Sequence, residues 1–277
     1  MNGTQTSRAA AFRKLHESGC FVLPNPWDPG TARYLAQVGF KALATTSAGF
    51  AFSRGLPDSV TAITVDQMVD HVRDIADSTP LPVNADFQNG YADDPESVAN
   101  NVKRCIESGV AGLSIEDATG NREKPLYDER LAVERIEAAR KAINDSTIPV
   151  VLTARCEAWL VGHPSAQKVA VDRLVAFAEA GADCLYAPGV REPDDIRTIV
   201  RAVAPKPVNV LVGRPGLTVT QLADLGVRRI SVGSALSRVA WGAFMRAVQE
   251  IADAGTFESF GDAGAFADLN EVFRGIN

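Results

Sequence analysis

The feature that most constrains the fold is a set of eight short apolar runs, each preceded by a residue that ends a helix. The runs begin near residues 20, 41, 82, 111, 149, 183, 207 and 228. From the second run onward, a preceding Gly (Gly39, Gly109, Gly181, Gly226) alternates strictly with a preceding Pro (Pro82, Pro149, Pro207). Gly ends helices in the left-handed conformation and Pro cannot continue one, so each position predicts a helix-to-strand junction.

Amphipathic segments separate these runs, with apolar residues three and four apart, as in 28–39, 97–109, 128–143, 166–181, 192–204 and 218–226. Eight strand-helix units predict a (β/α)8 TIM-type barrel, and 277 residues suit a fold that needs about 250. An open doubly wound sheet is the alternative. We expect a single barrel domain over residues 1–277, with 256–277 as a C-terminal helical extension. The long helix predicted at 235–255 is of a kind that often packs on a neighbouring subunit.

Composition narrows the class of ligand. The formal net charge is −6 and no basic patch is visible, which argues against a nucleic-acid surface. No apolar run reaches the length of a membrane span, and the first 19 residues lack the apolar stretch of a secretory signal. The four cysteines have no CxxC spacing, which favours reduced thiols in a cytoplasmic protein. Small molecules are the expected partners.

Three charged residues, Asp86, Glu116 and Arg155, stand where an apolar run gives way to a polar loop. Charges at the ends of core strands are costly unless they face a site, so this placement predicts the mouth of an active site. Asn84 and Asp86 are two residues apart and share one strand face. Together with Glu116 they would suit Mg²⁺, which takes one or two carboxylates directly and keeps several waters.

Each of these residues also has a structural interpretation. Arg155 could clamp a substrate carboxylate with its two-pronged guanidinium, or it could form an ion pair with Glu157 or Glu116. Asp86 and Asp117 could cap the loops that follow them.

Other candidates come from the remaining strand ends. The second run ends in small residues, Thr46, Ser47 and Ala48, a turn able to offer backbone N–H groups to an anion. Asn209 is able to face inward from the seventh run. His71 is predicted to lie on the surface. The chain has no GxSxG, P-loop or HExxH motif, so serine-hydrolase and nucleotide-binding functions are not indicated.

Four segments, TTSAGFAFSRGLPD, PVNADFQNGY, VAGLSIED and LTARCEAWL, occur in this order at the expected strand ends. They resemble the isocitrate lyase and phosphoenolpyruvate mutase superfamily, and the similarity spans about residues 8–255. The resemblance implies a (β/α)8 barrel that binds an α-keto acid or its enolate through Mg²⁺. It also implies a homodimer or homotetramer in which the eighth helix is exchanged between subunits.

The resemblance assigns roles residue by residue. Asp58 matches the acidic residue of the loop after strand two, Asp86 and Glu116 match the metal-side carboxylates, and Arg155 matches the arginine that holds the substrate carboxylate. Residues 46–48 match the turn whose backbone contacts the keto acid; Ser47 stands where the family commonly has Gly, which could narrow the pocket.

Three positions depart from the family pattern. Asn84 replaces the first aspartate of the metal motif, which removes one negative charge. The lyases carry a KKCGH or KRCGH loop, but here Lys124 stands at the Cys position and Arg122 at the preceding basic position. Pro188 stands where lyases have Glu and mutases have His. The isocitrate and methylisocitrate lyase mechanism therefore lacks its proton donor.

The sequence thus predicts a Mg²⁺-dependent (or Mn²⁺-dependent) carbon–carbon lyase or decarboxylase for a small 2-oxo or 2-hydroxy dicarboxylate, similar to an oxaloacetate decarboxylase. Asp58, Arg122 and Lys124 are candidate catalytic residues beside Arg155, and Arg122, Lys124 or Tyr127 could protonate the product. Phosphoenolpyruvate mutase or phosphonopyruvate hydrolase chemistry is one alternative. A non-catalytic protein that binds α-keto acids is another.

Overall fold

The computed structural model describes residues 2–274, and the last residues of the predicted C-terminal extension, 275–277, lie outside them. All eight predicted strands are present and parallel, in the order β1-β8-β7-β6-β5-β4-β3-β2. Their bounds are β1 Phe21–Leu23, β2 Leu43–Ala44, β3 Val83–Asp86, β4 Gly112–Glu116, β5 Val151–Arg155, β6 Cys184–Tyr186, β7 Val208–Leu211 and β8 Arg229–Ser231. The (β/α)8 prediction is confirmed, and the open doubly wound alternative is wrong.

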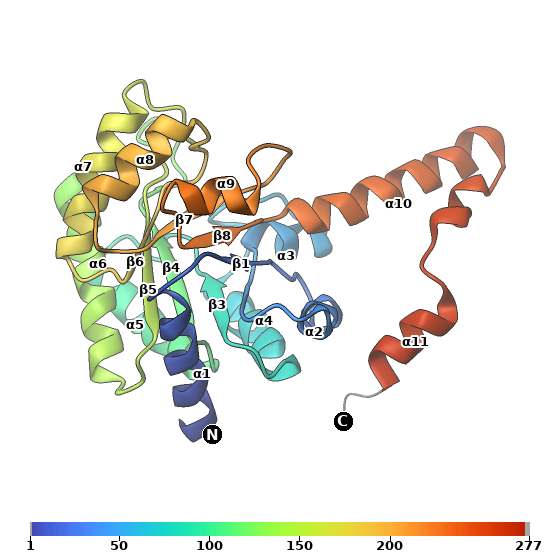
Figure 1. Ribbon diagram of the computed structural model, residues 1–277, viewed down its shortest axis with the longest axis horizontal. Coiled ribbons are helices and arrows are strands. Elements are labelled where there is room, and N and C mark those ends of the chain that lie inside the picture. Colours follow the sequence, from blue (N-terminus) through green and yellow to red (C-terminus); the bar gives the residue numbers. More distant parts are fainter. Residues whose placement is uncertain (1, 275–277) are drawn as a thin grey trace.

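Helices connect these strands and cover the outside of the barrel (Figure 1). Their bounds are α1 Asn2–Leu15, α2 Pro29–Val38, α3 Ser47–Ser53, α4 Val65–Ser78, α5 Pro95–Glu107, α6 Glu129–Asp145, α7 Ala166–Glu179, α8 Pro193–Ala202, α9 Val219–Asp224, α10 Ala235–Ala254, η1 Glu258–Asp262 and α11 Phe266–Arg274. In the part of the chain that the structure describes, no helix is both long enough and apolar enough to traverse a bilayer.

The barrel closes between β1 and β2 through a few specific contacts instead of a full strand pairing. The Ala44 N–H donates to the Pro24 carbonyl at 3.0 Å. The Asn25 side chain donates to the Thr45 carbonyl at 2.8 Å and accepts from the Val232 and Gly233 N–H groups at 2.9 Å each. One buried amide therefore ties the first, second and eighth strands together at the end where the site lies.

α1 plugs the opposite, N-terminal end of the barrel. Its Phe12 is fully buried with Ala9 against Leu23 and Val151. A Cβ at Gly112, the first residue of β4, would lie 2.6 Å from the Phe12 ring. Glycine at this position lets the ring enter, which leaves the C-terminal end of the barrel as the open end.

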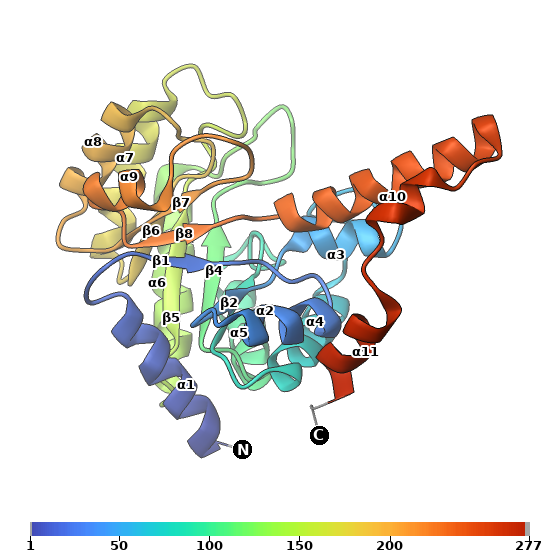
Figure 2. The ribbon, with the colours of Figure 1, turned by 45° about the vertical axis from the view of Figure 1, so that its right-hand side comes forward.

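α10 leaves the barrel and projects away from it (Figures 1 and 2), and along its length Ser237 is the buried residue. Its apolar side chains face solvent, with Val239 71%, Met245 63% and Phe244 56% exposed. The tail then returns to the chain's own α2, where Gln37 donates to the Val272 carbonyl at 2.5 Å. The predicted helical extension is present, whereas exchange of α10 between subunits stays a prediction.

Candidate active site

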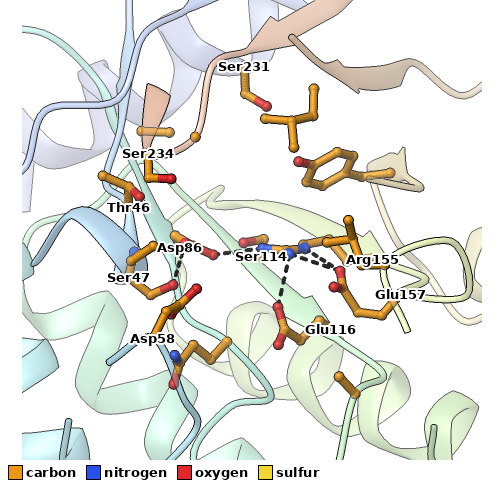
Figure 3. Close-up of a pocket in the computed structure, with 18 of the residues that line it drawn as sticks. Thr46, Ser47, Asp58, Asp86, Ser114, Glu116, Arg155, Glu157, Ser231 and Ser234 are labelled. Carbon is orange, nitrogen blue, oxygen red and sulfur yellow. Dashed lines mark hydrogen bonds and ion pairs between the residues drawn. The ribbon is translucent and has the colours of Figure 1, made fainter. Parts of the chain in front are cut away.

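A cavity of about 530 Å³ opens at the C-terminal ends of the strands. The three charged strand-end residues that the sequence singled out, Asp86, Glu116 and Arg155, all line it, and Asp58 joins them from the loop after α3 (Figure 3). Parallel strands bring their carboxyl ends to one rim, which is why residues 69 positions apart, Asp86 and Arg155, meet here.

Arg155 is the centre of this group. Its Nη1 lies 2.9 Å from Asp86 Oδ1, and its Nη2 lies 3.1 Å from Glu116 Oε2. Its Nε donates to Glu157 Oε1 at 2.9 Å. The ion pairs that the sequence offered as an alternative for Arg155 are therefore formed. Three carboxylates share one guanidinium, and the role of Arg155 as a substrate clamp stays a prediction.

Asp86 is also held from α3. The Ser47 N–H and the Ser47 hydroxyl both donate to Asp86 Oδ2, each at 2.9 Å. The predicted small-residue turn at 46–48 is in fact the start of a helix, in which the Thr46 hydroxyl caps the Gly49 N–H at 3.2 Å. Thr46, Ser47 and Ala48 line the cavity as expected, but Ser47 contacts the carboxylate that orients Arg155.

Burial and mutual repulsion govern the protonation of these carboxylates. Burial raises the pKa of Glu116 well above its ordinary value, and Arg155 only partly offsets this. Burial raises the pKa of Glu157 as well. Asp58 lies on an exposed loop, but its carboxyl group faces the cavity, where reduced hydration and the nearby Asp86 raise its pKa. The group around Arg155 holds more negative charge than one guanidinium neutralises.

This donor set fits a hard divalent cation that keeps most of its waters. Within residues 2–274, no three Asp, Glu, His or Cys side chains converge into a closed metal-binding cluster. Asp86 and Glu116 are both in the cavity, and Mg²⁺ needs only one or two direct carboxylate ligands. Asn84 lies deeper, beside Gly112, and its buried Oδ1 has no hydrogen-bond partner. Such an orphaned acceptor is what a bound water or ion would satisfy.

The loop after β4 lines the cavity with Gly120. Gly120 packs against Val60 of the loop after α3, where a Cβ at position 120 would collide with the Val60 side chain. Arg122 lines the cavity, as predicted for a residue near the substrate. Lys124 instead points outward, 63% exposed, and pairs with Asp128 at 2.9 Å. Tyr127 is buried away from the cavity, where its hydroxyl bonds Asn89 and Asp93. In this arrangement neither Lys124 nor Tyr127 reaches the substrate space.

Two further residues turn out to be structural. Asp117 is buried in an ion pair with Arg173 at 2.8 Å and accepts the Glu157 N–H, so its side chain holds the start of the loop after β5 and not, as its capping interpretation expected, the loop that follows Asp117 itself. His71 was expected on the surface but is buried and stacked on Phe50, with ring centroids 3.7 Å apart. That prediction is wrong because the helix face carrying His71 packs against α3.

The structure also reveals a polar barrel interior, of which the sequence analysis named only Asn209. Asn209 lines the cavity, but its amide is already engaged, with Nδ2 donating to Ser231 Oγ at 2.9 Å and Oδ1 accepting from Arg229 Nε at 2.8 Å. Tyr186 and Ser114 line the cavity as well. The available signal was parity: each lies an even number of residues from an inward-facing neighbour on its strand.

The family model for phosphoenolpyruvate phosphomutase matches residues 12–252. An uncharacterised protein of Mycobacterium tuberculosis H37Rv is 36% identical over 229 residues, covering 81% of this chain and 82% of that protein. Oxaloacetate decarboxylase of Pseudomonas putida GB-1 is 31% identical over 237 residues, covering 81% and 78%.

Two solved structures extend the similarity. A protein from Burkholderia cenocepacia J2315, described as a candidate lyase/mutase, shares 48% identity with a TM-score of 0.94, covering 98% of this chain and 97% of that one. Oxaloacetate acetylhydrolase in complex with its product oxalate shares 29% identity with a TM-score of 0.85, covering 96% and 94%.

Proposed function

Since the chain belongs to the phosphoenolpyruvate mutase and isocitrate lyase superfamily, we propose that it is a Mg²⁺-dependent carbon–carbon lyase acting on a small 2-oxo dicarboxylate. Oxaloacetate is the leading substrate, because relatives that are similar along most of their length are an oxaloacetate decarboxylase and an oxaloacetate acetylhydrolase. Decarboxylation is the simplest reaction this site could support, since it needs an acceptor for electrons but no attacking nucleophile.

One observation carries the proposal: Arg155 is held by Asp86, Glu116 and Glu157 at the mouth of the cavity. Burial opposes the charge on Arg155, but these carboxylates outweigh it and keep the pKa of the guanidinium above its ordinary value. A permanent cation in a partly dehydrated cavity is suited to a substrate carboxylate.

In this mechanism Mg²⁺, or Mn²⁺ in its place, would be held by Asp86 and Glu116 with waters, and would supply Lewis acidity at the keto oxygen. Arg155 would orient the substrate carboxylate beside it. Ser47 keeps Asp86 in place through its two hydrogen bonds. Arg122 and Asp58, on two loops that contact each other, would cover the substrate and exclude water.

The test is whether the purified protein with Mg²⁺ releases pyruvate from oxaloacetate faster than Mg²⁺ alone, followed with lactate dehydrogenase. We expect Asp86→Asn to lower the rate by about 10²-fold or more, as removal of a key electrostatic group does. Asp128→Asn, which changes an exposed carboxylate outside the cavity, should leave the rate unchanged.

Calorimetry with oxalate, a mimic of the pyruvate enolate, separates the remaining outcomes. Oxalate binding that needs Mg²⁺, without turnover of any candidate substrate, would favour a non-catalytic α-keto-acid-binding protein. If the protein neither turns over oxaloacetate nor binds oxalate, the proposal is refuted.

We also propose that the protein is a homodimer or homotetramer assembled through α10. The exposed apolar side chains of this helix support the proposal, because such a surface is unusual for a monomer.

A further inference from the structure

On the loop that carries the catalytic cysteine in the lyases, Lys124 points outward and Tyr127 is buried elsewhere. Arg122 reaches the cavity, but a guanidinium does not give up its proton in proteins. A decarboxylase still has to protonate the carbon that loses CO₂. We propose that Tyr186, the last residue of β6, is the acid that protonates this carbon, and that Arg229, Asn209 and Ser231 orient its hydroxyl. This inference rests on the proposed function and names the group that completes it.

Tyr186 stands in the right place for this role. Tyr186 is only 7% exposed, and it lines the cavity together with Asp86, Glu116 and Ser231. The guanidinium carbon of Arg155 lies 5.1 Å from the centre of the ring. A substrate held by Arg155 would therefore lie beside this ring.

A chain of hydrogen bonds fixes the direction in which Ser231, a neighbour of the phenol, can donate. Arg229 has only donors, so its Nε must donate to the Asn209 carbonyl oxygen, at 2.8 Å. This sets the orientation of the amide, whose Nδ2 then donates to Ser231 Oγ at 2.9 Å. Ser231 therefore has its own hydrogen free to give, and its hydroxyl partly offsets the rise in the pKa of the Tyr186 phenol, which favours the phenolate. With Ser231 as a donor beside it, the Tyr186 phenol would keep its own hydrogen available to the cavity that it lines.

The origin of this chain is an unusual buried cation. Arg229 is 2% exposed, and its other contacts are neutral acceptors, with Thr153 Oγ1 at 3.0 Å and His16 Nε2 at 3.2 Å. Among the ion pairs of residues 2–274, none joins Arg229 to a carboxylate. Its charge is thus not cancelled locally and polarises the donors above it, because hydrogen bonds in series strengthen one another at low dielectric.

The protonation state of Tyr186 suits a donor. Burial raises the pKa of Tyr186 to about 12, and the nearby Arg155 limits the rise. The groups that face it, Arg155, Glu157, Asp86 and Ser231, leave the phenol protonated at neutral pH. A weak acid is sufficient, because the carbon of a keto-acid enolate is a stronger base than a phenolate.

The proposed step balances as follows. The bond between C3 and the C4 carboxylate of oxaloacetate breaks, CO₂ leaves, and the electron pair forms the enolate of pyruvate. C3 takes the proton of Tyr186 Oη, giving pyruvate and a phenolate that Ser231 and Arg155 stabilise. After product release, water returns the proton to Tyr186. The net reaction consumes one proton and yields pyruvate and CO₂.

The test follows the reverse of the protonation step, exchange of the pyruvate methyl hydrogens with D₂O, by proton NMR with Mg²⁺ present. We expect the wild type to catalyse exchange and Tyr186→Phe to lose about 10²-fold or more of it, the usual worth of an acid–base group. Mg²⁺-dependent oxalate binding should change by less than about threefold, because oxalate takes no proton. Ser231→Ala should lose part of the exchange, and Tyr34→Phe, which removes a phenol 53% exposed on α2, should lose none.

The outcomes separate this inference from the function on which it rests. If the wild type decarboxylates oxaloacetate but Tyr186→Phe exchanges pyruvate at the wild-type rate, Tyr186 is not the acid while the proposed function stands. If Tyr186→Phe loses exchange and oxalate binding together, the phenol acts through the shape of the site and the inference is wrong. A wild type that neither decarboxylates nor binds oxalate overturns the proposed function and this inference with it.

Discussion

Replacing His16 with Gln should reduce the loss of unfolding free energy that occurs when the pH is lowered. His16 lies on α1 at the closed end of the barrel, where its Nδ1 bonds the Phe12 carbonyl at 2.8 Å and its Nε2 faces Arg229 Nη1 at 3.2 Å. A carbonyl only accepts and a guanidinium only donates, so Nδ1 carries the hydrogen and Nε2 accepts. Burial, and then the charge of Arg229, lower the pKa of His16 from 6.5 to about 3. Protonation would remove the acceptor and place two cations together.

The magnitude follows from the two pKa values. The unfolded chain protonates His16 below about pH 6.5 and the folded chain only below about pH 3, so the stability due to neutral His16 is present above pH 6.5 and lost as the pH falls toward 3. At about pH 5 the loss amounts to about 2 kcal/mol relative to pH 7.5. Gln keeps a neutral acceptor but does not titrate.

Urea unfolding of the wild type and His16→Gln at both pH values measures the difference directly. We expect the wild type to lose about 2 kcal/mol more than the variant between about pH 7.5 and pH 5. Other titrating groups, including buried His71 and Glu116, are common to both proteins and cancel in the comparison. Equal losses, within about 0.5 kcal/mol, would show that His16 is not held neutral and that its contact with Arg229 is misassigned.

Two further predictions concern Arg155 and α10. Arg155→Met leaves the buried carboxylates of Glu116 and Glu157 without their cation. We expect it to lower the free energy of unfolding, measured in urea at neutral pH, by about 3–5 kcal/mol. A loss below about 1 kcal/mol would mean that these ion pairs are not formed in solution. Phe244→Glu places a charge on the exposed apolar face of α10 and should reduce the molar mass measured by light scattering. The control Phe266→Glu, on α11, should leave the molar mass unchanged. An unchanged mass for Phe244→Glu would rule out assembly through this face.

The strands could be predicted from the sequence because their signals are local. A Gly or Pro ends each preceding helix within one or two residues of the apolar run, and no distant contact is needed to place the junction. The plug formed by α1 could not be predicted in this way. It depends on Phe12 entering a space that exists because Gly112, 100 positions away, has no side chain. The surface position expected for His71 was wrong for the same reason. Its burial depends on Phe50, which only the folded chain brings into contact with the imidazole ring.

The candidate site divides along the same line. Asp86, Glu116 and Arg155 were predictable because a charge at the end of an apolar run is conspicuous, and the rim of a parallel barrel collects such residues whatever their separation. The sequence could not show which acidic residue pairs with Arg155, because in the fold Arg155 contacts three carboxylates. Tyr186 was not identified, because strand parity can place it inside the barrel but does not separate a cavity-lining tyrosine from an ordinary core residue.

The charges of the cavity are separated in a way that explains why a proton donor belongs on the β6–β8 side. Asp58, Glu116 and Asp86 gather around Arg155 on one side, while Ser231 lies on the other, toward the upper edge of the view in Figure 3. A cation bound among the carboxylates would neutralise negative charge on the oxygen of an enolate, but a carboxylate there could not readily give up a proton without adding to the repulsion. On the opposite side, Arg229 polarises Ser231 through Asn209, and the Ser231 hydroxyl favours the negative charge that proton donation would leave on the phenol. The acid that completes the reaction is therefore expected where the barrel interior is cationic, and not on the loop after β4 where the lyases keep theirs.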